Sequence, residues 1–340
     1  MGLGSSLTIM VIGLLVLAYS SSRLVKLMVA LSSILKMPKF LLSFVILGLG
    51  TSLPDLFVSA FAASQLQFDM VIATIIGANI IVMCLVVGVV TIRKGFFAVR
   101  ENTILENFGW IFFVLAIPFF LMLDNKLTSM EGFILIVVYA MYLYNIKEQE
   151  PVAKKEEDET RQVSVAQGLR EHDLGRTVLM LVLFVGVVVV AANFVVGSAL
   201  TFSTDFKVNP MLIGFIILSL GMALPEFAVD LNALRNREEE VIWGDVIGSF
   251  ITELTLVLGL AAVVSGGMAF QFQNFIVAYG FMVLAFLLVF FFAYRKKQLS
   301  RNEGIMLVLL YVIFISVQVD LVHSLSNGAP GVLTALASAK

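Results

Sequence analysis

The chain has 340 residues, of which 60% are hydrophobic and only 14% are charged, and its formal net charge is −2. Its mean hydropathy of +1.01 excludes a water-soluble globular domain, which would have to expose large apolar patches. No basic region or motif indicates nucleic acid, a nucleotide or a redox cofactor as a partner. We therefore expect an integral protein of a lipid bilayer.

Long apolar stretches follow one another along almost the whole chain. The hydrocarbon core of a bilayer takes roughly 20 apolar residues per helix. Ten such stretches occur, at 6–28, 40–65, 70–92, 104–123, 128–146, 177–202, 209–234, 241–264, 273–294 and 303–323. The sequence therefore predicts an all-α, polytopic membrane protein with ten transmembrane helices.

The basic residues predict the orientation of these helices. They lie at or beyond the ends of the odd-numbered stretches, and only Lys126, Lys207 and Lys340 fall on the other side. Lys and Arg are enriched in cytoplasmic loops. We therefore predict a multi-pass protein of the cell (inner) membrane with both the N-terminus and the C-terminus outside.

One extended polar tract, residues 147–175, divides the ten stretches into five and five. Its mixed charges lack the spacing of a calcium-binding loop, and it is too short for a folded regulatory domain. We interpret 147–175 as a cytoplasmic linker between a first five-helix unit, 1–146, and a second, 176–340.

The two units share a repeated motif. Residues 46–60, ILGLGTSLPDLFVSA, match residues 217–231, ILSLGMALPEFAVDL, so that Pro54 aligns with Pro225 and Asp55 with Glu226. The register continues without a gap for about 45 residues, which chance seldom produces. Because each unit has an odd number of spans, the second enters the membrane from the opposite side. Two inverted five-helix repeats are typical of secondary transporters.

The motif breaks a helix and places an acid beside the break. Pro54 has no amide hydrogen for the carbonyl of Gly50, and Pro225 has none for that of Gly221. Glycine lets the backbone depart from helical geometry there, and we expect the freed carbonyls to face a polar cavity. In each repeat the acid, Asp55 or Glu226, follows in mid-span.

A third acid, Glu253, is also central in its span, and it shares one helix face with Asp245 and Ser249. Each mid-span carboxylate costs about 2.5–3.5 kcal/mol on insertion scales, so three of them without a Lys or Arg at that depth need a cation or protons. With the hydroxyls they form a hard-oxygen set that suits Ca²⁺, or Na⁺ where fewer charges face the ion. Asp245 and Asp230 are nearer the membrane ends, where a solvated or capping role fits them at least as well.

The motifs GTSLPD and GMALPE, each followed after about twenty residues by IGA or IGS, resemble the two alpha-repeats of the calcium/cation antiporter superfamily. Among its members, prokaryotic sodium/calcium exchangers are the most similar. The resemblance implies exchange of Ca²⁺ against Na⁺ by alternating access, in which the first and sixth helices slide past the others. Metal cations are then the expected partners, transported rather than held as cofactors, and the sequence carries no signal for an oligomeric state.

The resemblance also implies a set of ligands. Asp55 and Glu226 would be the principal Ca²⁺ ligands, helped by the backbone carbonyls of Thr51 and Met222, and Glu253 would occupy the position of a central acid.

Flanking Na⁺ sites are implied in the same way. One would use Thr51 and Ser52 with the carbonyl of Gly48. The other would use Ser249 with the carbonyl of Ser219.

The sequence departs from the superfamily pattern at several of these positions. Met222 and Ala223 stand where the second repeat usually has two hydroxyls, and Ala78 and Val82 stand where the first usually has a serine and an asparagine. The first acid is Asp55 rather than the commoner Glu, which withdraws its carboxylate by about one methylene. Each sodium site therefore lacks side-chain ligands, the second more severely.

These departures keep several functions open. One alternative is a proton-coupled or otherwise altered cation exchanger, because carboxylates crowded in a low-dielectric site can exchange protons for a metal ion. Another is a cation-binding homologue with impaired transport. A remote alternative is an intramembrane enzyme that uses paired acids as a catalytic dyad.

Overall fold

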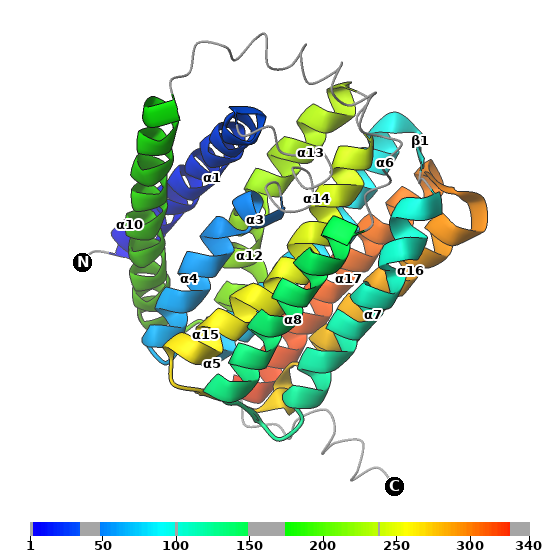
Figure 1. The fold of residues 1–340 in the computed structure, drawn as a ribbon. Coiled ribbons are helices and arrows are strands. Elements are labelled where there is room, and N and C mark those ends of the chain that lie inside the picture. The colour runs from blue at the N-terminus through cyan, green and yellow to red at the C-terminus, as the bar shows by residue number, and fades with distance from the viewer. Residues whose placement is uncertain (1–2, 35–47, 99–100, 149–173, 237–238, 327–340) are drawn as a thin grey trace, which may run out of the picture.

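The computed structural model describes residues 3–34, 48–98, 101–148, 174–236 and 239–326. Figure 1 shows a bundle of long helices that run up and down. The elements before residue 149 are α1 (Leu3–Ile34), α3 (Gly48–Thr51), α4 (Leu53–Ser64), α5 (Phe68–Ile80), the π-helical η2 (Ile81–Val86), α6 (Val87–Lys94), β1 (Phe96–Ala98), α7 (Glu101–Leu121), β2 (Lys126–Leu127) and α8 (Ser129–Glu148).

The elements after residue 173 repeat much of this order. They are α10 (Leu174–Phe206), α11 (Pro210–Leu212), η4 (Ile213–Leu218), α12 (Ser219–Met222), α13 (Leu224–Asn236), α14 (Glu239–Thr252), η5 (Glu253–Val257), α15 (Leu258–Val264), β3 (Met268–Ala269), the 3₁₀ turn η6 (Phe272–Asn274), α16 (Ile276–Lys296), β4 (Gln298–Ser300) and α17 (Arg301–Ser326). η4 and η5 are π-helical, like η2.

The predicted fold class is confirmed. Among the described residues, seven helices are long and apolar enough to cross a membrane, and three shorter apolar helices lie at 53–64, 109–121 and 129–145. Together they coincide with the ten predicted spans. Residues 40–47 of the second predicted span, and most of the predicted linker, lie outside the described residues. The helices beside the linker extend to Glu148 and begin at Leu174.

Glycines let equivalent helices of the two units cross at very short distance. A Cβ on Gly48 of α3 would lie 2.9 Å from the carbonyl carbon of Gly248 on α14. At the positions related by the repeat register, a Cβ on Gly77 of α5 would lie 3.0 Å from the Ser219 side chain of α12. The short strands pair in the same crossed manner, β1 with β4 and β2 with β3. The two units therefore interlock, each broken helix against a helix of the other unit.

The break in each broken helix is confined to a single residue. Ser52 separates α3 from α4, and Ala223 separates α12 from α13. The backbone amide of Ser52 still donates to the carbonyl of Gly48 at 3.2 Å, and that of Ala223 donates to the carbonyl of Ser219 at 3.0 Å. The helices are thus kinked at their prolines rather than unwound over a turn.

The sequence led us to expect that the Gly50 carbonyl, which Pro54 leaves without a backbone partner, would face a polar cavity. In the structure it accepts a hydrogen bond from a side chain instead. The hydroxyl of Ser21 on α1 donates to the carbonyl oxygen of Gly50 at 2.9 Å. A buried carbonyl without a donor is costly, so this bond compensates for the missing proline amide. The expectation was wrong at Gly50 because a side chain distant in the sequence supplies the donor.

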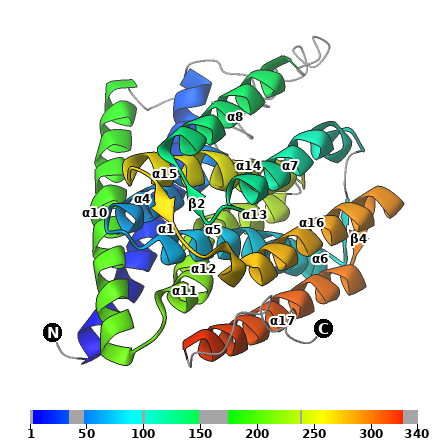
Figure 2. The same cartoon turned by 90° about the horizontal axis from the view of Figure 1, so that it is seen from below.

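α1 and α10 form a pair at one side of the bundle. They pack along each other over much of their length, and Figures 1 and 2 both show them side by side. The pair reaches the other helices mainly through the broken ones, because α1 contacts α3, α4, α12 and α13, and α10 contacts α4. Contacts between this pair and the rest of the protein are therefore concentrated on the two broken helices.

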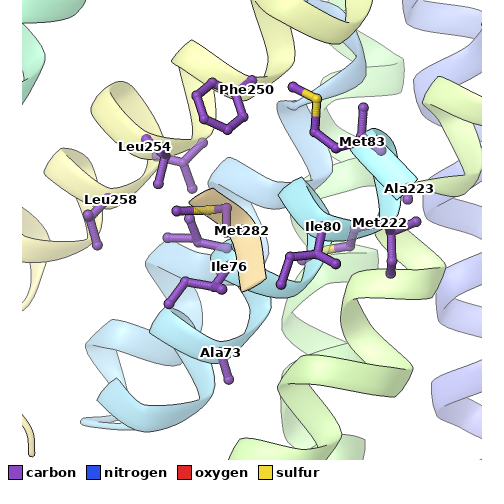
Figure 3. Packing of buried hydrophobic residues seen from close by; sticks show 14 of the residues in the cluster. Ala73, Ile76, Ile80, Met83, Met222, Ala223, Phe250, Leu254, Leu258 and Met282 are labelled. Carbon is purple, nitrogen blue, oxygen red and sulfur yellow. The ribbon is translucent and has the colours of Figure 1, made fainter. Parts of the chain in front are cut away.

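A layer of buried apolar side chains lies in the middle of the bundle. Figure 3 shows Ile76 of α5, Leu254 of η5 and Met282 of α16 within one cluster of buried hydrophobic residues. Each is at most 1% exposed. Polar side chains at this depth therefore have little water to solvate them, which makes any buried charge expensive unless it is compensated.

Candidate functional site

Three carboxylates meet at the centre of the bundle. Asp55 comes from α4, Glu226 from α13 and Glu253 from the first position of η5. One oxygen of each lies within 4.8 Å of the others, and each side chain is at most 2% exposed. We call these residues the central cluster. Oxygens at this spacing can bind a single cation between them.

The sequence explains why the acids converge. Asp55 and Glu226 each follow a proline and occupy the first turn of a helix, where the N-terminal end of the helix dipole favours negative charge. Glu253 begins a π-helical segment, and such segments occur frequently at functional sites. The equivalent segment of the first unit, η2, begins at Ile81, next to Val82, which aligns with Glu253 in the repeat register. Helix irregularities on three elements therefore bring the three carboxylates together.

Within the part of the chain that the structure describes, no positive charge is buried with the central cluster. No Lys, Arg or His belongs to the buried polar side chains of the described residues. Three carboxylate oxygens of the cluster have no hydrogen-bond partner among the described residues. They are Oε1 and Oε2 of Glu226 and Oδ2 of Asp55. Charges buried in this way cost several kcal/mol each unless they are paired. The arrangement therefore favours an added cation, and its hard oxygens suit Ca²⁺ or Na⁺.

Asn79 of α5 supports Glu253, and sequence reasoning missed it. Its amide nitrogen donates to Oε2 of Glu253 at 2.7 Å and to the carbonyl of Ile75 at 2.8 Å. Its carbonyl oxygen is buried without a partner among the described residues. The amide missing at Val82 is thus partly replaced three residues earlier. A polar residue within an otherwise apolar span was the signal that could have identified it.

The hydroxyls of the first repeat lie beside the central cluster. Thr51 donates to Oδ1 of Asp245 at 3.1 Å and to the carbonyl of Gly48 at 3.3 Å. Ser52 is 1% exposed, and its hydroxyl has no hydrogen-bond partner among the described residues. An unsatisfied buried hydroxyl beside a kinked helix is suited to serve as an ion ligand.

The second repeat offers fewer oxygens. Ser249 donates to the carbonyl of Val246 at 3.3 Å, and Ser219 donates to that of Phe215 at 2.5 Å. Both hydroxyl protons are thus directed to backbone carbonyls of their own helices, which leaves the hydroxyl oxygens as acceptors.

The side chains of Met222 and Ala223 belong to the apolar layer rather than to a polar site. Both are buried in the same cluster as Ile80 and Met83, and Figure 3 shows all four. Val82 is buried in this cluster too. At these positions the hydroxyls and the amide expected from the resemblance are replaced by hydrophobic packing.

The sequence left a solvated or capping role and ion binding open for Asp230 and Asp245, and the structure contradicts the solvated role. Both are 0% exposed. Asp230 lies one turn after Glu226 on α13, and α13 packs against α14, which carries Asp245. Position along a span did not exclude that role, because packing between the two helices, rather than distance from the helix ends, buries these carboxylates.

Two interlocked units with kinked helices, and buried acids where those helices meet, define a membrane-embedded secondary transporter for cations. Comparison with known proteins identifies its family. The family model "Sodium/calcium exchanger protein" matches residues 5–146 and 176–319. The chain therefore belongs to the sodium/calcium exchanger family, which is a family of transporters and not of enzymes.

Individual relatives agree with this assignment. The chain is 24% identical to the inner membrane protein YrbG of Escherichia coli over 314 residues, which cover 91% of this chain and 95% of the relative. It is also 24% identical to the sodium/calcium exchanger MaX1 of Methanosarcina acetivorans over 342 residues, which cover 91% of this chain and 97% of MaX1.

A solved structure has the same fold. The sodium-calcium exchanger NCX_Mj, soaked with Na⁺ and Sr²⁺, superposes with a TM-score of 0.65 at 22% identity, and the match covers 93% of this chain and 99% of NCX_Mj. This likeness confirms the expected fold.

Proposed function

We propose that this protein is a secondary-active antiporter that exchanges Ca²⁺ against Na⁺ or H⁺ by alternating access at the central cluster. The observation that carries the proposal is the convergence of Asp55, Glu226 and Glu253, whose oxygens lie within 4.8 Å of one another inside an apolar bundle. Membership of the sodium/calcium exchanger family supports it.

In this proposal each candidate residue has a stated role. Asp55 and Glu226 bind Ca²⁺ together with the backbone carbonyls of Thr51 and Met222, and Glu253 supplies a central negative charge. The unsatisfied oxygens of Glu226 and Asp55 support these roles, because a cation would compensate them.

The Na⁺ ligands are divided unequally between the repeats. Thr51 and Ser52 with the carbonyl of Gly48 form the first Na⁺ site, and the unpartnered hydroxyl of Ser52 supports it. Ser249 with the carbonyl of Ser219 forms the second, poorer site.

A second candidate, coupling to H⁺, is favoured by a specific observation. The side chains of Met222 and Ala223 are packed into the apolar layer. The second Na⁺ site therefore lacks side-chain oxygens at the two positions where the resemblance leads us to expect hydroxyls. Five carboxylates are buried nearby, and carboxylates are able to carry protons.

Alternating access in this proposal is a movement of α1 and α10 against the remaining helices. Their pairing with each other, and the concentration of their other contacts on kinked helices, support a movement as one unit. The two units, 1–146 and 176–340, then supply the inverted repeats whose exchange of roles opens the site to either side.

Ion flux tests the function directly. Purified protein in proteoliposomes should take up ⁴⁵Ca²⁺ when a Na⁺ or an H⁺ gradient is imposed. The gradient that drives uptake identifies the coupling ion. Lack of gradient-driven uptake in both cases, with tight Ca²⁺ binding retained, would show a transport-impaired homologue and contradict the proposal.

Substituting Glu226 tests the site. The Glu226→Gln change keeps the shape of the side chain but removes one of three converging charges, so we expect ⁴⁵Ca²⁺ uptake to fall to background. Asp205→Asn is the matched control, because Asp205 is exposed at the end of α10. Wild-type uptake by Glu226→Gln would rule out the assigned site.

The orientation of the chain is also part of the proposal, with both termini outside and the linker 147–175 in the cytoplasm. Cys84 is the only cysteine and is buried, so introduced cysteines can be labelled against a low background. A membrane-impermeant maleimide applied to intact cells should label Asp205→Cys but not Arg295→Cys. The reverse labelling would invert the assigned orientation.

A further inference from the structure

Asp230 and Asp245 are two buried acids outside the central cluster. Both are 0% exposed. Neither oxygen of Asp230 has a hydrogen-bond partner among the described residues, and the same holds for Oδ2 of Asp245. Buried carboxylate oxygens without a donor are uncommon in folded proteins, and each one calls for an explanation such as a bound ion.

The helix geometry places these two acids on the same side of the central cluster. α13 and α14 pack together and are separated in sequence only by residues 237–238, so they run in opposite directions. Asp230 lies one turn from Glu226 toward that connection, and Asp245 lies two turns from Glu253 in the same direction. Asp230 is close enough to interact electrostatically with both Asp245 and Glu226.

Thr51 joins this pair to the kink in the first repeat. Its hydroxyl donates to Oδ1 of Asp245 at 3.1 Å. The donation leaves the hydroxyl oxygen as an acceptor next to Asp245, whose Oδ2 has no hydrogen-bond partner among the described residues. Asp230 therefore lies about 6 Å along its helix from Glu226, and Asp245 about 12 Å along its helix from Glu253, both toward the connection of α13 to α14.

The charges require more than one cation. Asp55, Glu226, Asp230, Asp245 and Glu253 are all at most 2% exposed, and no Lys, Arg or His is buried among the described residues. One Ca²⁺ in the central cluster compensates only two of the carboxylates. A monovalent ion at the second position would leave one net negative charge on the pair of Asp230 and Asp245, whereas a divalent ion balances that pair.

We propose that Asp230 and Asp245, with the hydroxyl of Thr51, form a second site for a divalent cation of the Ca²⁺ class, located between the central cluster and the connection of α13 to α14. The choice of ion rests on the proposed function, because the ion is of the class that the central cluster transports. The site gives an entering ion a binding position one to two helix turns before the central cluster.

Binding stoichiometry tests this site without transport. Equilibrium dialysis of the purified full chain against ⁴⁵Ca²⁺ in a Na⁺-free buffer should give a second Ca²⁺ per chain in the wild type. Asp230→Asn and Asp245→Asn should each bind a single Ca²⁺. Asp55→Asn should also bind a single Ca²⁺, because Asp55 belongs to the central cluster, and the double variant Asp55→Asn/Asp230→Asn should bind none.

Two controls show whether a loss of bound Ca²⁺ comes from unfolding and whether Ca²⁺ binds to exposed carboxylates. Asp205→Asn, at an exposed position of α10, should bind as the wild type does. The melting temperature of Asp230→Asn with EGTA should be equal to that of the wild type or higher, because the substitution removes an uncompensated buried charge.

The outcomes separate this inference from the proposed function. A single Ca²⁺ per wild-type chain, or a second Ca²⁺ retained by Asp230→Asn, overturns the second site. If gradient-driven flux is observed in the same protein, the proposed antiporter function is still supported. A wild type that binds no Ca²⁺ overturns the second site, and flux then decides the proposed function separately.

Discussion

The crossing of α3 over α14 gives the sharpest test of how the fold positions the central cluster. Gly48 is on the same broken helix as Asp55, and Gly248 is on the same helix as Glu253. In Gly48→Ala, the new Cβ would meet the carbonyl carbon of Gly248 at 2.9 Å and its Cα at 3.0 Å. Because carbon atoms pack best at about 3.5–4.0 Å, the two helices would have to separate by roughly 0.5–1 Å.

The magnitude follows from this displacement. Overpacking of a dense interior costs about 1–3 kcal/mol, so the melting temperature in detergent should fall. Metal–ligand distances tolerate only about 0.2 Å, and the displacement between Asp55 and Glu253 exceeds that. We expect the Ca²⁺ concentration for half-maximal uptake to rise by about tenfold or more, equivalent to ~1.4 kcal/mol or more of binding free energy.

Uptake of ⁴⁵Ca²⁺ into proteoliposomes and thermal unfolding measure the two effects. Gly280→Ala on α16 is the matched control, because no atom lies within 4 Å of its added Cβ. Alanine favours a helix over glycine by about 1 kcal/mol, so this variant should be as stable as the wild type or more stable. If Gly48→Ala kept the wild-type melting temperature and Ca²⁺ dependence, close helix crossing would not be what positions the acids.

Two further substitutions test contacts that only the structure revealed. Asn79→Leu removes the donor to Glu253, and a hydrogen bond to a charged group contributes about 1.5–3 kcal/mol. The Ca²⁺ concentration for half-maximal uptake should therefore rise roughly 10- to 100-fold. Gln65→Leu, at an exposed position, should not change this concentration, and an unchanged concentration for Asn79→Leu would contradict the role of the amide. Ser21→Ala leaves the Gly50 carbonyl without its donor, which costs about 1–3 kcal/mol and should lower the melting temperature. Ser22→Ala should not lower it, because the hydroxyl of Ser22 donates to the carbonyl of Ala18 on its own helix. Equal melting temperatures for the two variants would refute the bond between α1 and α3.

The sequence by itself determined the class of this protein and the centre of its candidate site. Apolar stretches of bilayer length have only one stable form in lipid, the helix, so span positions follow from composition. The paired motifs around Pro54 and Pro225 identified the two kinks and the acids beside them, because proline acts on its own helix. Membership of the sodium/calcium exchanger family agrees with both inferences.

Only the tertiary structure decided which polar groups face one another. Asn79 bonds to Glu253 across 174 positions of sequence, and Thr51 bonds to Asp245 across 194. No local pattern encodes such contacts, because they depend on how helices of the two units cross. Helix packing also buries Asp230, for which a position near the membrane end had left a solvated role open. It also brings the hydroxyl of Ser21 to the carbonyl of Gly50. Sequence thus located the charges, and helix packing determined their partners.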